Sequence, residues 1–237
     1  ISEQNVNVSN SRQITIPITV RSQAGPTKVT YLYITKISTS LKLSELTLDG
    51  KEANTYDENT DTYRFLISSE NTEFELFALA ESDYSILEYD GTAYEASIRA
   101  NVSMGLDEQG KILKIKQHSE AGESAEHTVE IVRISDNTNL EFLKVNNITR
   151  QPDEAGGDTY TVPITKDATS VLIEVQTEYS FANVRLGDNA VIRHHDKGVL
   201  TCDDLNEQRI IVPVVVTAAD GVAIRTYNIV LLRKGSS

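Results

Sequence analysis

Several residue types are scarce in this chain of 237 residues, and each shortage excludes a class of protein. A single cysteine, Cys202, cannot form an intramolecular disulfide, so the chain is not a disulfide-stapled scaffold. Basic residues are outnumbered 22 to 35 by acidic ones and form no run or stripe, which argues against nucleic acid as a partner. No apolar stretch approaches the length of a membrane-spanning helix, and the first residues form no signal-peptide pattern. We therefore expect a fragment whose targeting or anchoring segment lies outside it.

Aromatic residues are also few, with 10 Tyr, 5 Phe and no Trp. Most of them fall at positions that alternating strands would turn inward, which leaves little for an exposed stacking surface. The sequence therefore does not favour the binding of sugars or single-stranded nucleic acid.

What the chain does have is alternation of apolar and polar residues with a period of two, as in residues 14–20 and 210–216. This period is typical of half-buried β-strands, and no segment of useful length shows a helical period. The sequence predicts an all-β protein.

The chain also repeats itself at a domain-sized spacing. Eight residues recur identically 97 positions later: Leu43, Leu46, Asp61, Thr62, Tyr63, Ile67, Thr72 and Glu81 as Leu140, Leu143, Asp158, Thr159, Tyr160, Ile164, Thr169 and Glu178. The shift holds without a gap to about residue 88, so it preserves strand phase as well as identity. An array of modules is expected, and arrays form rods or multivalent surfaces more often than catalytic pockets.

Three closing hairpins are expected, at the turns 24–25, 121–122 and 220–221, each with a glycine that supplies positive φ. Only two openings precede them. The sequence therefore predicts two antiparallel sandwiches, residues 39–135 and 136–237, and a partial repeat, residues 1–38, that contributes only closing strands.

Two strands alone are marginal in water, so residues 1–38 should pair with a neighbouring copy, a second chain, or residues absent from this chain. Strand exchange with another copy is one such possibility, and a hairpin simply packed on the next domain is the alternative. The linkers, residues 38–41 and 136–139, are short and should limit bending. Proline at matching positions, Pro17 and Pro213, should block edge pairing on one side.

By its motifs, the chain resembles the cadherin-like β-sandwich repeat of secreted and surface proteins of bacteria. Spaced leucines and a polar turn open each copy in residues 43–50 and 140–147, a tyrosine begins a strand at Tyr63 and Tyr160, and residues 227–233 match the closing strand. Departures from the pattern are His127 and Thr30 in place of the closing tyrosine, and Glu-Gln in place of Gly-Asn before the penultimate strand. The resemblance implies immunoglobulin-like sandwiches, an extracellular or cell-surface location, and no catalytic residue.

Calcium is the ligand that a cadherin-like fold suggests, and residues 56–61 and 202–207 are acidic loops. Neither has EF-hand spacing, and the two linkers hold one carboxylate between them, so no metal site and no cofactor is predicted. The cluster His194-His195-Asp196 lacks further ligands at a recognised spacing, and His118 and His127 are expected at the surface or in packing.

Enzyme chemistry finds no support, because Cys202 lacks the context of a nucleophile and no catalytic motif occurs. We predict no catalytic residue. A spontaneous Lys–Asn bond would need Lys114 or Lys116 to be buried, and nothing forces either inward. The sequons at Asn101 and Asn147 are usually idle in bacteria.

Two functions remain after these exclusions. The first is a non-catalytic spacer or adhesion region of a bacterial secreted or cell-surface protein. The second is a binding module that recognises a protein or glycan through sandwich-end loops or an open sheet edge. The loop of residues 188–204, with Arg193, His194, His195 and Lys197, is the feature that distinguishes them: projection beside exposed aromatics favours binding, and folding back favours a spacer.

Overall fold

The fold was described from a computed structural model, in which residues 12–68, 70–192 and 197–233 are described. These residues form strands and no helix, so the all-β prediction is confirmed, and no described segment is a helix that could cross a membrane. The strands are β1 (Gln13–Arg21), β2 (Thr27–Thr35), β3 (Leu43–Leu48), β4 (Lys51–Glu52), β5 (Thr55–Asp57), β6 (Thr62–Ile67), β7 (Glu73–Ala80), β8 (Ile86–Tyr89), β9 (Thr92–Glu95), β10 (Ser97–Ser103), β11 (Gly110–His118), β12 (Ser124–Arg133), β13 (Leu140–Val145), β14 (Ile148–Thr149), β15 (Thr159–Ile164), β16 (Val171–Thr177), β17 (Asn183–Leu186), β18 (Gly198–Cys202), β19 (Arg209–Thr217) and β20 (Ile224–Arg233).

The chain divides into two compact units. The first comprises Ile1–Glu52, Glu75–Asn101 and Lys114–Thr128, and the second comprises Ala53–Phe74, Val102–Leu113 and Val129–Ser237. Strands β7, β10, β11 and β12 contribute residues to both units. These strands belong to two sheets, with strand orders β10-β7-β3-β4 and β5-β6-β12-β11-β8-β9.

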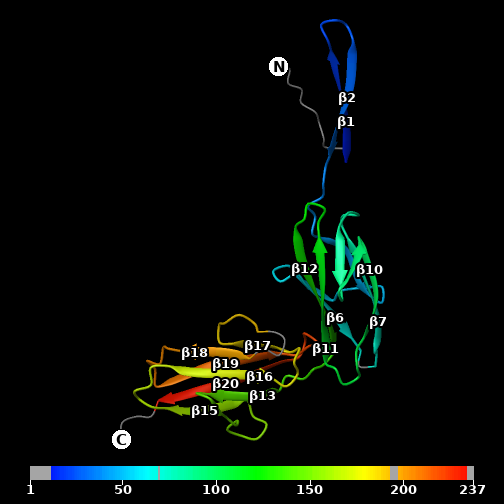
Figure 1. The fold of residues 1–237 in the computed structure, drawn as a ribbon. Helices are drawn as coiled ribbons and strands as arrows, with labels where there is room; N and C mark the ends of the chain where they lie inside the picture. The colour runs from blue at the N-terminus through cyan, green and yellow to red at the C-terminus, as the bar shows by residue number, and fades with distance from the viewer. Residues whose placement is uncertain (1–11, 69, 193–196, 234–237) are drawn as a thin grey trace. The chain divides into compact units, whose positions relative to one another are not determined.

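In the first unit, β1 and β2 form a two-stranded antiparallel sheet from Gln13↔Thr35 to Arg21↔Thr27 (Figure 1). Strand β3 pairs with β4 and β7, and β8 pairs with β9 and β11, all antiparallel. The buried residues of β7 and β11 alternate with more exposed ones, as the period of two requires, whereas the buried residues of β3, Leu46 to Leu48, are consecutive.

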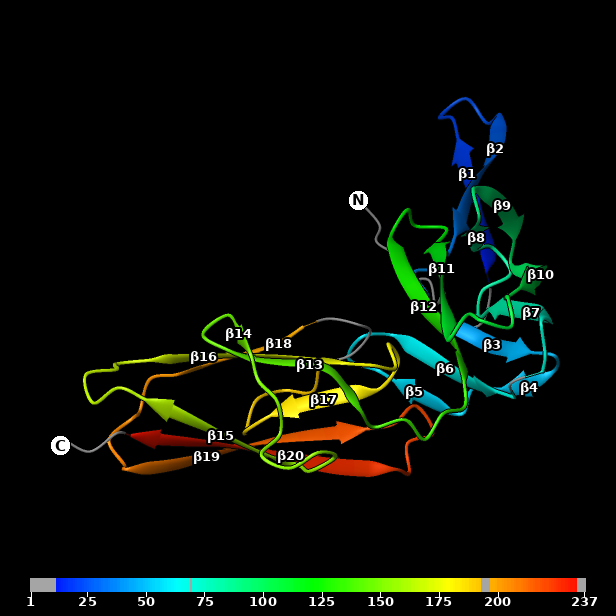
Figure 2. The same cartoon turned by 90° about the horizontal axis from the view of Figure 1, so that it is seen from below.

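The second unit contains a complete sandwich, whose two layers are visible in Figure 2. One sheet has the order β14-β13-β16-β18 and the other the order β15-β20-β19-β17. Apolar residues from both sheets form one core, among them Val145, Ile173, Val214 and Ile229, which are fully buried. The alternation seen in the sequence is therefore the alternation between this core and solvent.

One pairing departs from a purely antiparallel sandwich. Strand β15 runs parallel to β20, from Thr159↔Asn228 to Ile164↔Arg233. The chain leaves the first sheet after β14 and crosses to the edge of the second, where it arrives beside the last strand in the same direction. Periodicity cannot reveal this pairing, because alternation is the same in parallel and antiparallel edge strands.

The three predicted hairpin turns adopt one geometry. Gly25, Gly122 and Gly221 all have positive φ, of 103°, 87° and 73°. The amide of each glycine donates to the carbonyl three residues earlier, at 3.0 Å in all three turns. Each turn therefore needs glycine for the reason that the sequence predicted.

Candidate functional site

The residues that join successive modules make a hydrogen-bond pattern that occurs twice. The amide of Ala121 donates to Ser38 O at 3.1 Å, and the amide of Asp220 donates to Ser135 O, also at 3.1 Å. In both places the closing hairpin of a module thereby holds the start of the linker that precedes the same module. These contacts position the two linkers whose shortness the sequence had shown.

A glutamate fixes the other end of each linker. The amide of Glu178 donates to Asn139 O at 3.0 Å, as that of Glu81 donates to Lys42 O at 2.9 Å. The Glu178 carboxylate accepts from Asn139 Nδ2 at 3.0 Å and from Asn137 Nδ2 at 3.2 Å. These two amide donors, Asn139 first, lower the pKa of Glu178 below its ordinary value.

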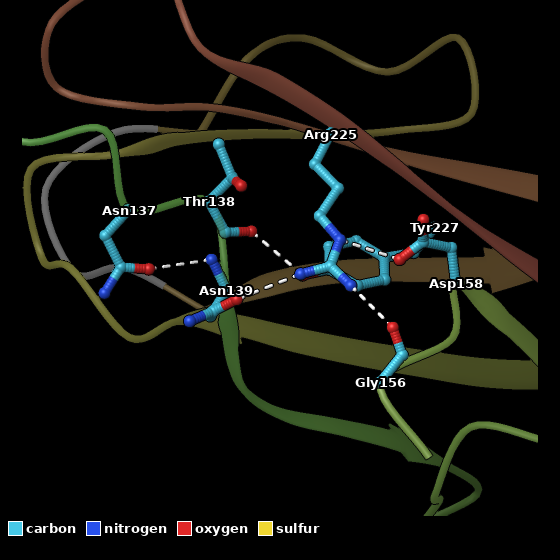
Figure 3. A network of polar contacts seen from close by, with 7 residues as sticks. All are labelled: Asn137, Thr138, Asn139, Gly156, Asp158, Arg225 and Tyr227. Carbon is cyan, nitrogen blue, oxygen red and sulfur yellow. Dashed lines mark hydrogen bonds and ion pairs between the residues drawn. The ribbon is translucent and has the colours of Figure 1, made fainter. Parts of the chain in front are cut away.

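Side chains of β20 hold the second linker to its sandwich (Figure 3). The Arg225 guanidinium donates to Asp158 Oδ1 at 2.7 Å, to Asn139 Oδ1 at 3.0 Å and to Gly156 O at 3.0 Å. It lies 4.8 Å from the centre of the Tyr227 ring, whose hydroxyl donates to Thr138 O at 3.0 Å. The linker is thus bound to β20 at both Thr138 and Asn139.

Within the second unit, Gln109 and Tyr179 form the most extensive polar contact between sequence-distant segments. The Tyr179 hydroxyl lies 2.9 Å from Gln109 O and 2.8 Å from Arg133 O. Gln109 Oε1 accepts from the Ser180 amide at 2.7 Å and from its hydroxyl at 2.6 Å. Tyr179 is only 9% exposed, and this burial raises the pKa of its hydroxyl.

The Arg133 side chain binds main-chain carbonyls in the same region. Its guanidinium donates to three carbonyls, those of Glu108, Ser68 and Gly105, at 2.9, 3.0 and 2.8 Å. Gln109 belongs to the Glu-Gln pair that the sequence analysis noted as a departure from the family pattern, and that signal revealed none of its partners.

The first unit has a different junction at the matching position, with Arg12 in the place of Gln109. Arg12 forms an ion pair with Glu120 at 2.6 Å, and its guanidinium carbon lies 3.1 Å from the centre of the Tyr84 ring. Glu120 also accepts from the Ser38 amide at 3.0 Å, and this bond is the main cause of its lowered pKa. At this position the first unit therefore has the Arg12–Glu120 ion pair, and the second unit has the uncharged side-chain amide of Gln109.

A cavity of about 700 Å³ lies in the second unit beside the Asp220 turn. Its wall includes Tyr56 and the ion pair of Arg64 with Glu130, in which Nε and Oε2 are 2.8 Å apart. The Oδ1 atom of Asn183, which also lines the cavity, is buried without a hydrogen-bond partner. The charges of Arg64 and Glu130 offset each other, but Asp57, Glu58 and Asp220 also line the cavity, so its wall is acidic overall.

Four tyrosines are more exposed than the sequence analysis expected. Tyr31, Tyr33, Tyr56 and Tyr84 each have more than half of their surface in solvent. Tyr56 packs against Tyr63 with ring centres 4.4 Å apart, at the edge of the cavity. The expectation that most aromatic rings face inward does not hold for these four, of which Tyr31 and Tyr33 lie on β2, Tyr56 on β5 and Tyr84 between β7 and β8.

The two acidic loops form internal turns. Asp57 Oδ1 accepts from the Asn59 amide at 3.1 Å, and Asp61 accepts from the Tyr56 hydroxyl at 3.1 Å. In the second loop, Asn206 donates to Asp204 at 2.6 Å. Across the three described stretches of chain, no group of three or more His, Cys, Asp or Glu side chains could hold a metal ion.

The remaining candidates have ordinary structural environments where they are described. His127 is buried and hydrogen-bonds Gln117 at 2.8 Å, whereas His118 is half-exposed and contacts Ser124. His194, His195 and Asp196 lie outside the described residues, as does Arg193. Burial raises the pKa of the Cys202 thiol, which disfavours the reactive thiolate.

The two strand lysines are exposed rather than buried. Lys114 donates to Thr128 at 2.8 Å and pairs with Glu126 at 3.0 Å, while Lys116 lies on the solvent face of β11. Neither lysine has the buried environment that a spontaneous Lys–Asn bond requires.

Comparison with known proteins gave no match to any family model and no match among curated proteins. Solved structures with similar backbones include a chimeric titin Z1Z2 protein carrying a peptide from decorin, at 14% identity and a TM-score of 0.28, with 73% of this chain and 94% of that chain covered. PcdhgB3 EC1–4 has 11% sequence identity and a TM-score of 0.28, with 99% of this chain and 60% of that chain covered. The endo-fucoidan hydrolase MfFcnA4 of glycoside hydrolase family 107 has 11% sequence identity and a TM-score of 0.27, with 97% of this chain and 35% of that chain covered. The chain spans less than two thirds of the last two proteins, and at these scores none of the three bears on function.

Proposed function

We propose that this chain is a non-catalytic spacer region of a bacterial secreted or cell-surface protein, which holds other modules at a distance and offers weak adhesive contacts along its edges. The observation that carries the proposal is the hydrogen bonding of both linkers. Hairpin-tip amides, Glu81 and Glu178 bind linker atoms in the same way in both places. A chain that fixes every linker resists bending, which is the property a spacer needs.

The side-chain contacts at Tyr179 support the same function. Gly110 lies so close to Phe181 that a Cβ atom there would come within 2.6 Å of the ring. Close packing of this kind, together with four hydrogen bonds to Gln109 and Arg133, opposes rotation about the linker. A spacer of this type works by geometry alone and requires no bound ligand.

Backbone ¹⁵N relaxation tests this proposal. We expect amides of β5 and β6 and those of β13 to β20 to share one rotational correlation time in the unmodified chain. The double variant Gln109→Ala, Tyr179→Phe removes the junction bonds and should give two shorter, separate times. Thr161→Val, which loses the hydroxyl bond from Thr161 to Asp153 and touches none of the junction bonds, is the matched control and should behave as the unmodified chain. Separate times in the unmodified chain would contradict a stiff spacer.

The bacterial, extracellular part of the proposal rests on the motifs of residues 43–50 and 227–233. The complete reading frame around this sequence tests it. A secretion signal and a wall anchor in the same frame would support a surface spacer, and a cytoplasmic enzyme fused in frame would contradict it.

The cavity beside Tyr56 favours a second candidate, a module that binds a glycan. A half-exposed ring, a buried amide oxygen on Asn183 and a paired Arg64–Glu130 are groups that suit a sugar. The described ends of the 188–204 loop favour the spacer instead, because Ile192 pairs with Val184 and Lys197 binds Glu174 at 2.7 Å. Titration with neutral oligosaccharides, followed by chemical shifts of residues 55–66, distinguishes the two: saturable shifts that Tyr56→Ala abolishes would establish binding.

A further inference from the structure

The hairpin of β1 and β2 presents an apolar face that is solvent-exposed. In the β1–β2 register, Ile16 lies opposite Leu32 and Ile14 opposite Ile34, so these side chains share one face with Ile18 and Val20. Ile18 is 43% exposed, Val20 60% and Leu32 46%. Isolated aliphatic residues at a surface are ordinary, but six on one face of a two-stranded ribbon are not.

The matching residues of the other two hairpins are buried. At the positions of Ile18, Val20 and Leu32, the third hairpin has Val214, Val216 and Ile229, each with no exposed surface. The second hairpin has Ile115, Gln117 and Val129 there, also with none. The uncovered face of β1–β2 therefore has the pattern of a sandwich core face.

The sandwich of the second unit shows what covers such a face. Its core includes Leu143 and Val145 from β13 and Val171, Ile173 and Val175 from β16. All of these residues precede β19 in the chain. The covering sheet is thus built from the opening half of the same repeat, residues 136–207.

The two edges of the hairpin match two edges that are paired with further strands in the complete sandwich. In the sandwich, the outer edge of β20 pairs in parallel with β15, and the outer edge of β19 pairs antiparallel with β17. The matching edges of β2 and β1 carry no third strand among the described residues. Pro17 does not prevent such pairing, because Pro213 occupies its position in β19 and lies just beyond the β17 ladder.

A second copy of the hairpin would cover this face poorly. Strands of nine residues span about 30 Å, and two strands are about 10 Å wide, so two ribbons face to face would bury roughly 600 Å² in total. Stable specific interfaces bury about 1,200 Å² or more. Face-to-face pairing would also leave both edges of each ribbon open.

We infer that β1 and β2 are the closing strands of a further sandwich. The segment that covers their apolar face and pairs with their edges is an opening half-repeat with the strand pattern of residues 136–207. This half-repeat belongs to the same polypeptide and is joined to it on the N-terminal side of Arg12. The junction supports this inference. Arg12 O accepts from the Lys36 amide at 2.7 Å, as Gln109 O accepts from Arg133 and Gln208 O from Arg233, at 2.9 and 3.0 Å. The hairpin already has the closing geometry, and among the described residues it is joined to no other strand. The inference does not depend on the spacer function.

A chimera tests this assignment. A second copy of residues 136–207 is fused in place of residues 1–11, directly before Arg12, which preserves the register because Arg12 matches Gln208. Hydrogen exchange of the β1 and β2 amides is then measured by mass spectrometry in the chimera and in the unmodified chain. We expect rapid exchange in the unmodified chain and exchange slower by about 100-fold or more in the chimera.

Two further variants keep the test decisive. Thr30 occupies the place of Tyr227 and is smaller, so a second chimera also carries Thr30→Tyr to fill the core. Ile18→Glu in the chimera should abolish the new protection while β19 and β20 stay protected. Rapid exchange of β1 and β2 in both chimeras would overturn the assignment. Slow exchange in the unmodified chain, together with a dimeric mass in light scattering, would also overturn it, because the occupant would then be a second copy.

Discussion

The buried ion pair of Arg64 and Glu130 offers a quantitative prediction, because the chain contains its own uncharged counterpart. Arg64 on β6 and Glu130 on β12 are joined at 2.8 Å, and their side chains are 14% and 1% exposed. In the complete sandwich of the second unit, the matching positions hold Thr161 and Val230. The double variant Arg64→Thr, Glu130→Val therefore copies an arrangement that the chain already uses.

The free energy of unfolding should respond unequally to the three variants. Arg64→Thr leaves the carboxylate of Glu130 buried without its cation and should cost about 3–5 kcal/mol. Glu130→Val should cost less, about 2–3 kcal/mol, because the Arg64 side chain can extend into the adjoining cavity and reach water. The double variant should lie within about 1 kcal/mol of the unmodified chain, since neither charge is left alone. The coupling energy is then at least about 4 kcal/mol.

Denaturant-dependent hydrogen exchange of the β6 and β12 amides is the suitable assay. The chain has no Trp, and several modules in one chain violate two-state unfolding, so a site-resolved measurement is needed. Lys114→Ala is the control, because its pair with Glu126 is more than half exposed and should cost no more than about 1 kcal/mol. Equal losses for Arg64→Thr and the double variant would refute the reasoning, as would a double variant that costs the sum of the two single ones.

Two further predictions concern the junctions. Gly110→Ala should destabilise the contact with Phe181 by about 1–3 kcal/mol, because the new Cβ would lie 2.8 Å from Ile131 O and 2.6 Å from the Phe181 ring. Amide exchange at residues 179–182 measures this loss, and adding Phe181→Ala should relieve part of it. Unchanged exchange in Gly110→Ala would contradict the prediction. Because hydrogen bonds lower the pKa of Glu178, its stabilising contribution is present above the ordinary value of 4.5 and is lost as the pH falls through the lower folded value. Exchange of the 136–139 amides, corrected for intrinsic rates, should accelerate below about pH 4.5, Glu178→Gln should remove that acceleration, and a pH-independent rate in the unmodified chain would contradict the assignment.

The sequence predicted the strands because their signal is local. Alternation in residues 14–20 and 210–216 matches β1 and β19, and the glycines of the three closing turns have the positive φ that the pattern required. The 97-residue shift also anticipated hydrogen bonds that recur at the same spacing. These features depend on neighbouring residues or on a repeat, and both can be read directly from a chain.

The candidate site was less predictable, because its parts are distant in sequence and differ between copies. Arg64 and Glu130 have no charged counterparts in the next copy, so the repeat gave no sign that they pair. The bonds of the Tyr179 hydroxyl to Gln109 O and Arg133 O join segments that no motif connects. Exposed Tyr56 likewise follows from the end of a sheet, which alternation alone cannot locate.

The core of each hairpin shows how sequence differences between copies restrict what can cover it. In the second hairpin, buried Gln117 and His127 satisfy each other at 2.8 Å, and Gln117 also reaches Ser85 at 3.2 Å. The third hairpin replaces this pair with Val216 and Tyr227, and the first has Val20 and Thr30 in its place. A polar pair is stable in a core only when both members are present, because an unpaired buried group costs about 1–3 kcal/mol. Val20 can therefore pack only against an apolar opening half like that of residues 136–207, and an opening half that presents a serine like Ser85 would leave that hydroxyl without the glutamine it binds. For this reason, a chimera built from residues 39–108 should protect the hairpin less than one built from residues 136–207.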